Sequence, residues 1–192
     1  IFNMENAKIN KEINQFGISV IALDATDYLA SYAHSIGFWQ QYQHPEIILF
    51  GLPPTMMQNI LNDIVAMIKS GKTIELHKEY DDFFENGKSV FIPVDIRNKA
   101  DYFGYAIDFY KHDSFEAIEL IWTDRNYKFP WEAGFEEEFK FKQPLLDRNT
   151  DFKFSEDKDL IVWSSKEYKN GIVKVIHDDD GNWFFLSNAG DT

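Results

Sequence analysis

Cysteine is absent from the 192-residue chain. This absence excludes disulfide bonds, thiolate nucleophiles and every zinc or iron–sulfur site that depends on cysteine ligands. It also fits a reducing compartment, so we expect a cytoplasmic protein. Candidate functional groups must therefore be sought among the histidines, carboxylates, hydroxyls and aromatic side chains.

Basic residues are scarce: 19 Lys and Arg stand against 32 Asp and Glu, which gives a formal net charge of −13. The basic side chains are scattered singly among acidic ones. A negative field repels phosphate backbones, so we expect no nucleic-acid partner. The same field suits association with a basic protein, and a toxin is one candidate for such a partner.

Long apolar runs are also missing, and the first residues lack a basic segment followed by an apolar one. We therefore expect neither a membrane span nor a secretory signal in this chain, and no membrane partner. A glycine-rich phosphate loop, a serine nucleophile elbow and the H-E-x-x-H zinc motif are likewise not found. No complete catalytic set is recognisable.

Aromatic residues, by contrast, make up 17% of the chain, with 18 Phe, 9 Tyr and 5 Trp. They supply large apolar surfaces for a folded core. Short runs of strand type alternate with turn residues along the chain. The predicted strands of the larger part are Ile18–Leu23, Tyr28–Ile36, Ile47–Phe50, Val90–Val94 and Ala117–Trp122.

A helix is predicted directly after Pro53 and Pro54, because two prolines before a periodic segment favour a helix start. Its apolar side chains recur at helical spacing, and Gly71 marks its end. The predicted buried stripe is Met57, Ile60, Leu61, Ile64, Val65 and Ile68. A shorter helix is predicted over Tyr102–Tyr110, and residues 1–14 are interpreted as a weakly amphipathic helix or arm.

These elements predict an α+β fold: a mostly antiparallel sheet packed by one long amphipathic helix and a shorter one, with a small β-rich C-terminal module. We place the α+β domain at residues 1–148, a charged linker at 149–159 and a β-hairpin-rich module at 160–192. About 40 residues are too few for a robust independent core, so we expect this module either to pack on the first or to be incomplete.

Six blocks of the sequence resemble, in order and spacing, the bacterial family catalogued as domain of unknown function 4262. The resemblance covers about residues 16–146 and implies no known activity. His34 stands where a threonine is expected in that family, which argues against an obligatory hydroxyl donor here. The blocks are Tyr32–Gly37, His44–Glu46, Phe50–Pro53, Tyr102–Ala106, Trp122–Arg125 and Phe129–Trp131.

The tail from about residue 160, especially His177–Ser187, is similar to the start of the immunity-protein-33-like family. That resemblance implies, at most, a protein that binds and neutralises a toxin. The turn Asp178–Asn182 has the acidic start of a calcium loop but lacks its remaining spacing and closing glutamate, so we interpret it as a hairpin turn.

One candidate site is a metal site. His44 and Glu46 are two residues apart, so on an extended segment they project from the same face. Together with His34 they would provide two imidazoles and a carboxylate for a divalent metal, the one cofactor considered. The alternative is a structural turn, in which His44 and Glu46 bond to backbone groups.

A second candidate site is an aromatic pocket for a planar ligand. The alternative is that these rings fill a core poor in aliphatic residues. Beside them, Asp108 and Asp124 could act as a general acid or base, or simply cap turns. The predicted pocket residues are Tyr32, Tyr102, Tyr105, Trp122 and Trp131.

Two functions remain open from the sequence. The favoured one is a non-enzymatic binding module, of immunity type, whose acidic surface covers a basic partner; Glu136–Glu138 is an acidic patch suited to this. The alternative is a small-molecule enzyme or ligand sensor that uses the histidine, carboxylate and aromatic residues. Both the site and its chemistry depend on the separated blocks coming together in space.

Overall fold

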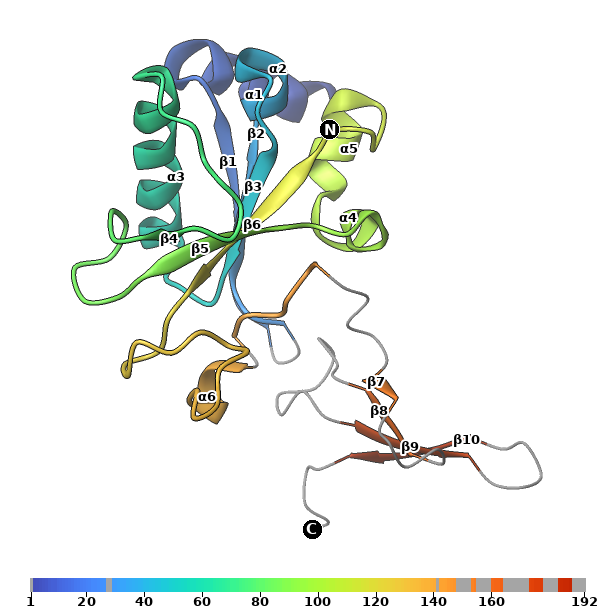
Figure 1. Ribbon diagram of the computed structural model, residues 1–192. Coiled ribbons are helices and arrows are strands. Elements are labelled where there is room, and N and C mark those ends of the chain that lie inside the picture. The colour runs from blue at the N-terminus through green and yellow to red at the C-terminus, as the bar shows by residue number, and fades with distance from the viewer. Residues whose placement is uncertain are drawn as a thin grey trace.

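A computed structural model describes residues 2–26, 29–140 and 142–147, together with four short strands in the remaining chain. The larger part forms a six-stranded sheet in the order β1-β2-β3-β6-β5-β4 (Figure 1). Neighbouring strands are antiparallel except β3 and β6, which run parallel. The predicted α+β class with a mostly antiparallel sheet is confirmed. The strands are β1 (Ser19–Leu23), β2 (Tyr32–Ile36), β3 (Glu46–Phe50), β4 (Glu79–Tyr80), β5 (Ser89–Pro93) and β6 (Ala117–Trp122).

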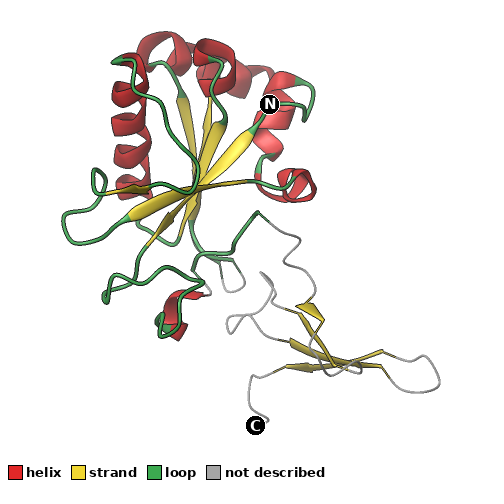
Figure 2. Ribbon diagram, viewed as in Figure 1, coloured by secondary structure: helices red, strands yellow, loops and turns green. Residues whose placement is uncertain are grey.

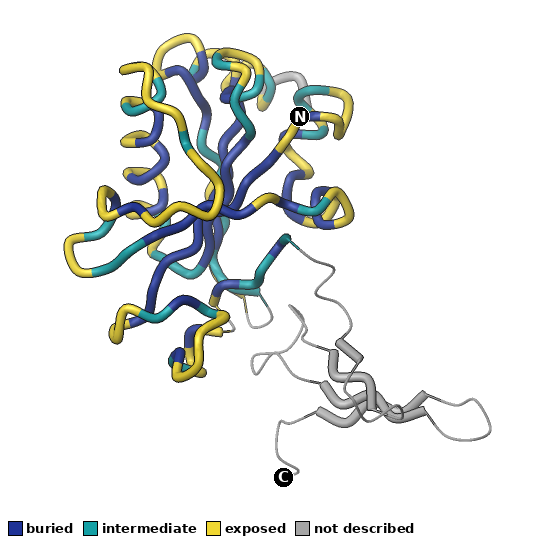
Figure 3. Tube along the Cα trace, viewed as in Figure 1, coloured by how far each residue is buried: buried dark blue, intermediate teal, exposed yellow. Residues whose placement is uncertain are grey.

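Helices cover both faces of this sheet (Figure 2). One apolar cluster joins α3 to Ile47 and Leu49 of β3, and a second joins α1, α4 and α5 to Ile48 and Phe50. All five residues of β3 are buried, which confirms the prediction of a strand covered on both faces (Figure 3). The helices are α1 (Phe2–Phe16), α2 (Phe38–Tyr42), α3 (Pro54–Lys69), α4 (Ile96–Tyr102), α5 (Gly104–Tyr110) and α6 (Glu137–Lys140).

The periodic apolar stripe correctly predicts α3. Five of its six predicted side chains are buried, and Ile68, near the end of the helix, is partly buried. Pro54 occupies the first helical position, where its missing N–H group has no partner to lose. α1 has 15 residues against 16 for α3, so the sheet carries two long helices rather than the one expected. Within the described residues, no helix combines the length and the apolar character that crossing a bilayer requires.

Two short helices differ from the prediction. No helix is predicted between the strands Tyr28–Ile36 and Ile47–Phe50, but Phe38–Tyr42 forms α2. Five residues are too few for a periodic signal. Gly37 has a φ of 126°, and a Cβ there would lie 3.1 Å from the carbonyl oxygen of Gly17. The predicted helix over Tyr102–Tyr110 corresponds to α5, which begins at Gly104. α4 was not predicted; it ends at Tyr102 and is separated from α5 at Phe103, which has a φ of −111°.

Four further strands form a second sheet in the order β10-β9-β8-β7, with antiparallel neighbours. β8 to β10 lie within residues 160–192, where a β-hairpin-rich module is predicted. β7 falls inside the predicted linker, and the rest of that linker lies outside the described residues, so the domain boundaries stay predictions. The strands are β7 (Lys153–Phe154), β8 (Leu160–Trp163), β9 (Val173–His177) and β10 (Trp183–Ser187).

Candidate functional site

The residues that the sequence grouped into one site lie at separate places on the sheet. In the parallel β3–β6 pair, Glu46 at the start of β3 aligns with Ala117 at the start of β6. His44 and Glu46 therefore lie at one end of the sheet, beside α2. The segment that leads to α6 follows the other end of β6 (Figure 1), and Trp131 belongs to this segment by its position in the sequence. The expectation that these blocks meet is wrong, because the parallel pairing separates the chain before β3 from the chain after β6.

Glu46 is fully buried and tied into a network of hydrogen bonds. Its Oε1 accepts from the backbone N–H groups of Gly37 (2.9 Å) and Trp39 (3.0 Å) and from the Tyr110 hydroxyl (2.5 Å). Its Oε2 accepts from Ser35 Oγ at 2.5 Å. Since the N-terminus of α2 has no capping side chain of its own, Glu46 caps this helix from the neighbouring strand.

Burial and hydrogen bonding shift the pKa values of two groups in this network, Glu46 and Tyr110. Burial raises the pKa of Glu46, while its four hydrogen bonds act in the opposite direction. Burial also raises the pKa of Tyr110, and the nearby Glu46 charge adds to this shift. Both carboxylate oxygens accept hydrogen bonds from within the chain, so the group is held in place by its neighbours. It joins β3, α2 and α5.

His34 is a completely buried histidine in β2. Its Nδ1 lies 3.1 Å from the carbonyl oxygen of Ser35, so Nδ1 carries the proton. Among the described residues, no group lies within hydrogen-bonding distance of its Nε2. The imidazole packs against the ring of Phe103, with 5.1 Å between the ring centroids. Burial lowers the pKa of His34 to about 4, so the side chain is neutral near pH 7.

This buried histidine makes stability sensitive to acid. The folded-state pKa of about 4 lies below the ordinary value of 6.5, so the unfolded chain binds the proton more tightly. The stabilisation is fully present above pH 6.5 and is lost as the pH falls toward 4. We expect a loss of about 3 kcal/mol in the free energy of unfolding, from the size of the pKa shift. Urea unfolding across this pH range measures it.

The matched comparison is His34→Leu, which cannot take up a proton at this position. Contributions of the other titrating groups are common to both proteins and cancel in the difference between their stabilities. The free energy of unfolding of the unmodified chain, taken relative to that of His34→Leu, should therefore fall by the expected loss from neutral to acidic pH. Parallel stability curves for the two proteins would contradict the assignment.

The structure does not assemble the predicted metal site from His34, His44 and Glu46. In the parts of the chain that the structure describes, no three His, Asp or Glu side chains are arranged to hold a metal ion. The Nδ1 of His44 lies 2.7 Å from the Pro45 carbonyl oxygen, and its ring packs on Phe38 at 5.4 Å. Burial lowers the pKa of His44. The geometry agrees with the alternative interpretation, a structural turn.

The predicted aromatic pocket is divided as well. Tyr32 stacks on Phe50 at 5.4 Å, and Tyr102 lies edge-on to both rings. Burial raises the pKa of Tyr32, and nearby Tyr105 adds to the shift. Trp122 belongs to the core on the opposite face of the sheet, where its Nε1 donates to the Phe50 carbonyl oxygen at 2.9 Å. Tyr32, Tyr102 and Trp122 fill the core, as the alternative interpretation has it, whereas Tyr105 is exposed.

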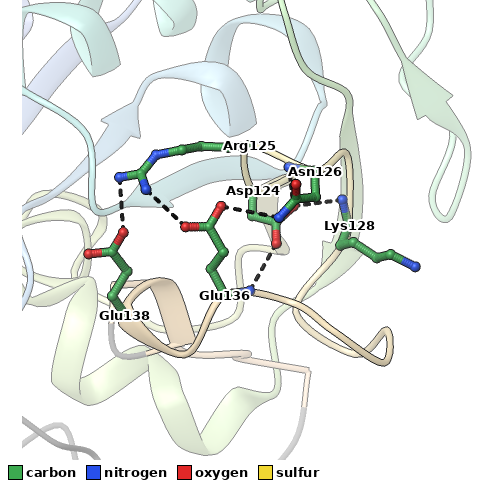
Figure 4. A network of polar contacts seen from close by, with 6 residues as sticks. All are labelled: Asp124, Arg125, Asn126, Lys128, Glu136 and Glu138. Carbon is green, nitrogen blue, oxygen red and sulfur yellow. Dashed lines mark hydrogen bonds and ion pairs between the residues drawn. The ribbon is translucent and has the colours of Figure 1, made fainter.

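Asp124 organises the loop after β6 (Figure 4). Its Oδ1 accepts from the backbone N–H groups of Asn126 (2.8 Å) and Lys128 (2.9 Å), and its Oδ2 from that of Glu136 (2.9 Å). Desolvation acts to raise the pKa of Asp124, but these hydrogen bonds lower it overall. A carboxylate held in this way is a turn-forming group rather than an acid or base. Asp108, the other predicted acid, is exposed on α5.

The acidic patch Glu136–Glu138 is compensated by basic side chains of the chain itself. Arg125 bridges Glu136 at 3.0 Å and Glu138 at 2.9 Å (Figure 4), and Lys140 pairs with Glu137 at 2.5 Å. The patch therefore presents less net charge to a partner than its sequence indicates. A basic partner would be attracted more strongly to carboxylates that are not paired within the chain.

A surface hollow of about 370 Å³ lies beside Trp131. Trp131 is 49% exposed, and its indole stacks on Phe129, with 5.0 Å between centroids and 10° between planes. Glu132 Oε2 accepts from the Phe129 N–H at 2.6 Å, which fixes this carboxylate at the rim. Sequence reasoning found Trp131 but missed its neighbours, for which the only local signal was the adjacent Glu132. The lining residues are His77, Glu79, Val90, Phe129, Trp131 and Glu132.

Comparison with known proteins gives one family. A family model described as a domain of unknown function, DUF4262, matches residues 12–136. No curated protein and no solved structure matches the chain. The match covers the six-stranded sheet and most of its helices.

Proposed function

The chain belongs to the DUF4262 family, whose description names no activity, and we propose from its own geometry that it is a non-enzymatic binding module for a basic protein segment. The observation that carries this proposal is the exposed indole of Trp131 in a hollow that also presents Glu79 and Glu132. An exposed aromatic face beside carboxylates is the arrangement that recognises a lysine or arginine side chain.

The stacked rings of Trp131 and Phe129 provide an aromatic surface that could bind a cation. Phe129 stacks on one face of the Trp131 indole, and about half of the tryptophan residue is exposed to solvent. An ammonium or guanidinium group over a tryptophan face is stabilised by about 0.5–2 kcal/mol, more when water is excluded. The stacked pair thus supplies a rigid platform for a basic side chain.

The acidic part of the hollow is only partly neutralised within the chain. Lys88 pairs with Glu79 at 2.6 Å, and Asp81 and Glu132 are close enough to add to the raised pKa of Lys88. Glu79, Asp81 and Glu132 therefore all act on the ammonium group of Lys88, whereas Arg125 and Lys140 both pair with the Glu136–Glu138 patch. The remaining negative charge favours a cationic partner and agrees in sign with the net charge of −13.

A basic toxin would be one protein that this hollow could bind. We therefore favour an immunity-type role, in which the chain binds and neutralises a toxin. Its support is the charge of the hollow and of the whole chain. The resemblance of residues 160–192 to immunity proteins stays a prediction, since the family match ends at residue 136.

The test uses an oligolysine peptide as the probe and calorimetry on the full chain. Trp131→Leu removes the aromatic face, and Glu132→Gln removes a charge while its amide oxygen still accepts from Phe129. We expect each change to weaken binding about fivefold, which corresponds to about 1 kcal/mol. Glu138→Gln, which removes a charge of the compensated patch, is the matched control and should leave the affinity within about twofold.

Equal losses in Trp131→Leu, Glu132→Gln and Glu138→Gln would mean that the peptide binds through the overall field alone, and the proposal would fail. The product of the neighbouring gene is the natural partner to examine by pull-down. Its retention should depend on Trp131 and decrease with salt.

A further inference from the structure

A second surface cleft, of about 580 Å³, lies at the opposite end of the sheet, over α2 and the end of α5. Its walls combine aromatic rings with primary amides. Neither Asp, Glu, Lys nor Arg is among the described residues that line it. The lining residues are Trp39, Gln40, Gln43, Tyr110 and His112.

The buried Glu46 carboxylate fixes two of these walls from beneath. Its Oε1 accepts both from the backbone N–H of Trp39 and from the hydroxyl of Tyr110. A capping side chain at Gly37 itself would stabilise the N-terminus of α2 but would make no contact with α5. Glu46 also fixes Tyr110 of α5 relative to Trp39 of α2, although residues 46 and 110 are 64 positions apart.

The third wall is oriented as well. The imidazole of His112 lies nearly parallel to the Tyr110 ring, with 5.9 Å between centroids and 27° between planes. Its Nδ1 lies 2.8 Å from Ser114 Oγ, which sets the orientation of the ring. A cleft whose walls are fixed before binding loses less conformational entropy when a ligand is bound.

We propose that this cleft binds a small, uncharged, planar heteroaromatic ligand of nucleobase type. Flat rings provide stacking surfaces for such a ligand, and base–aromatic stacking contributes about 1–3 kcal/mol per base. The amides of Gln40 and Gln43 each offer a donor and an acceptor, which match the edge of a heterocyclic base. The negative field of the chain, −13 in formal charge, disfavours a ligand that carries phosphate.

This site is separate from the Trp131 hollow, so the proposal stands independently of the proposed function. The two share no lining residue. A Trp39 variant tests the cleft, and a Trp131 variant of the same chemical type serves as the matched control.

Adenosine is the probe, titrated into the full chain and followed by tryptophan fluorescence and calorimetry. We expect adenosine to bind, AMP to bind more weakly and cellobiose to give no signal. Trp39→Leu should weaken adenosine binding at least fivefold, from the loss of one stacking contact. Trp131→Leu should leave it unchanged. Absence of adenosine binding, tighter binding of cellobiose, or equal losses in the two tryptophan variants would overturn the proposal.

Tyr110→Phe examines Glu46 and Tyr110 as positioning groups. The ring remains, but its bond to Glu46 is lost, so the wall is no longer held against Trp39. We expect the folded variant, verified by circular dichroism, to bind adenosine about threefold to tenfold more weakly, because rigidity of the site contributes to affinity. An affinity equal to that of the unmodified chain would show that the network serves folding alone.

Discussion

Replacing Glu46 by leucine is expected to lower the free energy of unfolding by about 4 kcal/mol, because several buried donors lose their acceptor. The backbone N–H groups of Gly37 and Trp39 and the hydroxyls of Ser35 and Tyr110 all donate to this carboxylate. A buried ion is often replaceable by an apolar side chain, but here the donors around it remain. Urea unfolding near neutral pH measures the change.

Glu46→Gln is the matched control for this experiment. Its amide oxygen can still accept from Gly37, Trp39 and Tyr110, so only the contact with Ser35 changes in kind. We expect a loss of about 1–2 kcal/mol for glutamine. Equal stabilities of the leucine and glutamine variants would contradict the role of Glu46 as a cap and anchor.

Truncation of Phe103 to alanine is expected to lower the free energy of unfolding by about 4 kcal/mol, as for other fully buried phenylalanines. Phe103 lies between α4 and α5 and is 0% exposed. Its ring packs on His34 at 5.1 Å and on Phe115 at 5.8 Å, so alanine leaves a cavity that rigid strands cannot close. Phe103→Leu, which keeps most of the volume, should lose less than about 1.5 kcal/mol.

The same truncation should alter the response to acid. A cavity beside His34 gives its imidazole access to water, so its pKa should rise toward the ordinary value of 6.5. The loss of stability on acidification should therefore be smaller in Phe103→Ala than in the unmodified chain. Unfolding free energies measured at neutral and acidic pH provide the comparison. An unchanged acid response would show that burial by Phe103 is not the cause of the lowered pKa.

Elements whose signal lies within their own residues could be predicted. The apolar stripe of α3, the continuous apolar run Ile47–Phe50 of β3 and the mostly apolar β6 predict their structure, because a covered strand or an amphipathic helix must bury those side chains. α2 could not be predicted in this way. Its N-terminus is capped by Glu46 from another strand, so the stabilising group lies outside the helix.

The candidate sites show the same limit. Trp131, Glu46 and His34 were identified as chemically notable, but grouping them required knowledge of strand order. The parallel pairing of β3 with β6 places Glu46 and Trp131 at opposite ends of the sheet. For Asp124, the alternative interpretation as a turn residue agrees with the structure. It could be reached from the sequence because the three N–H groups that donate to Asp124 all follow within 12 residues.

The sequence by itself determined the α+β class, the main helix, the buried strands, the acidic surface and the family. Only the tertiary structure decided which polar and aromatic residues meet: Glu46 with Tyr110, and Trp131 with Phe129 beside the Glu79 carboxylate. The physical reason is that burial and local hydrogen bonding leave patterns in neighbouring residues, whereas a site is formed by distant segments whose approach depends on strand order and register.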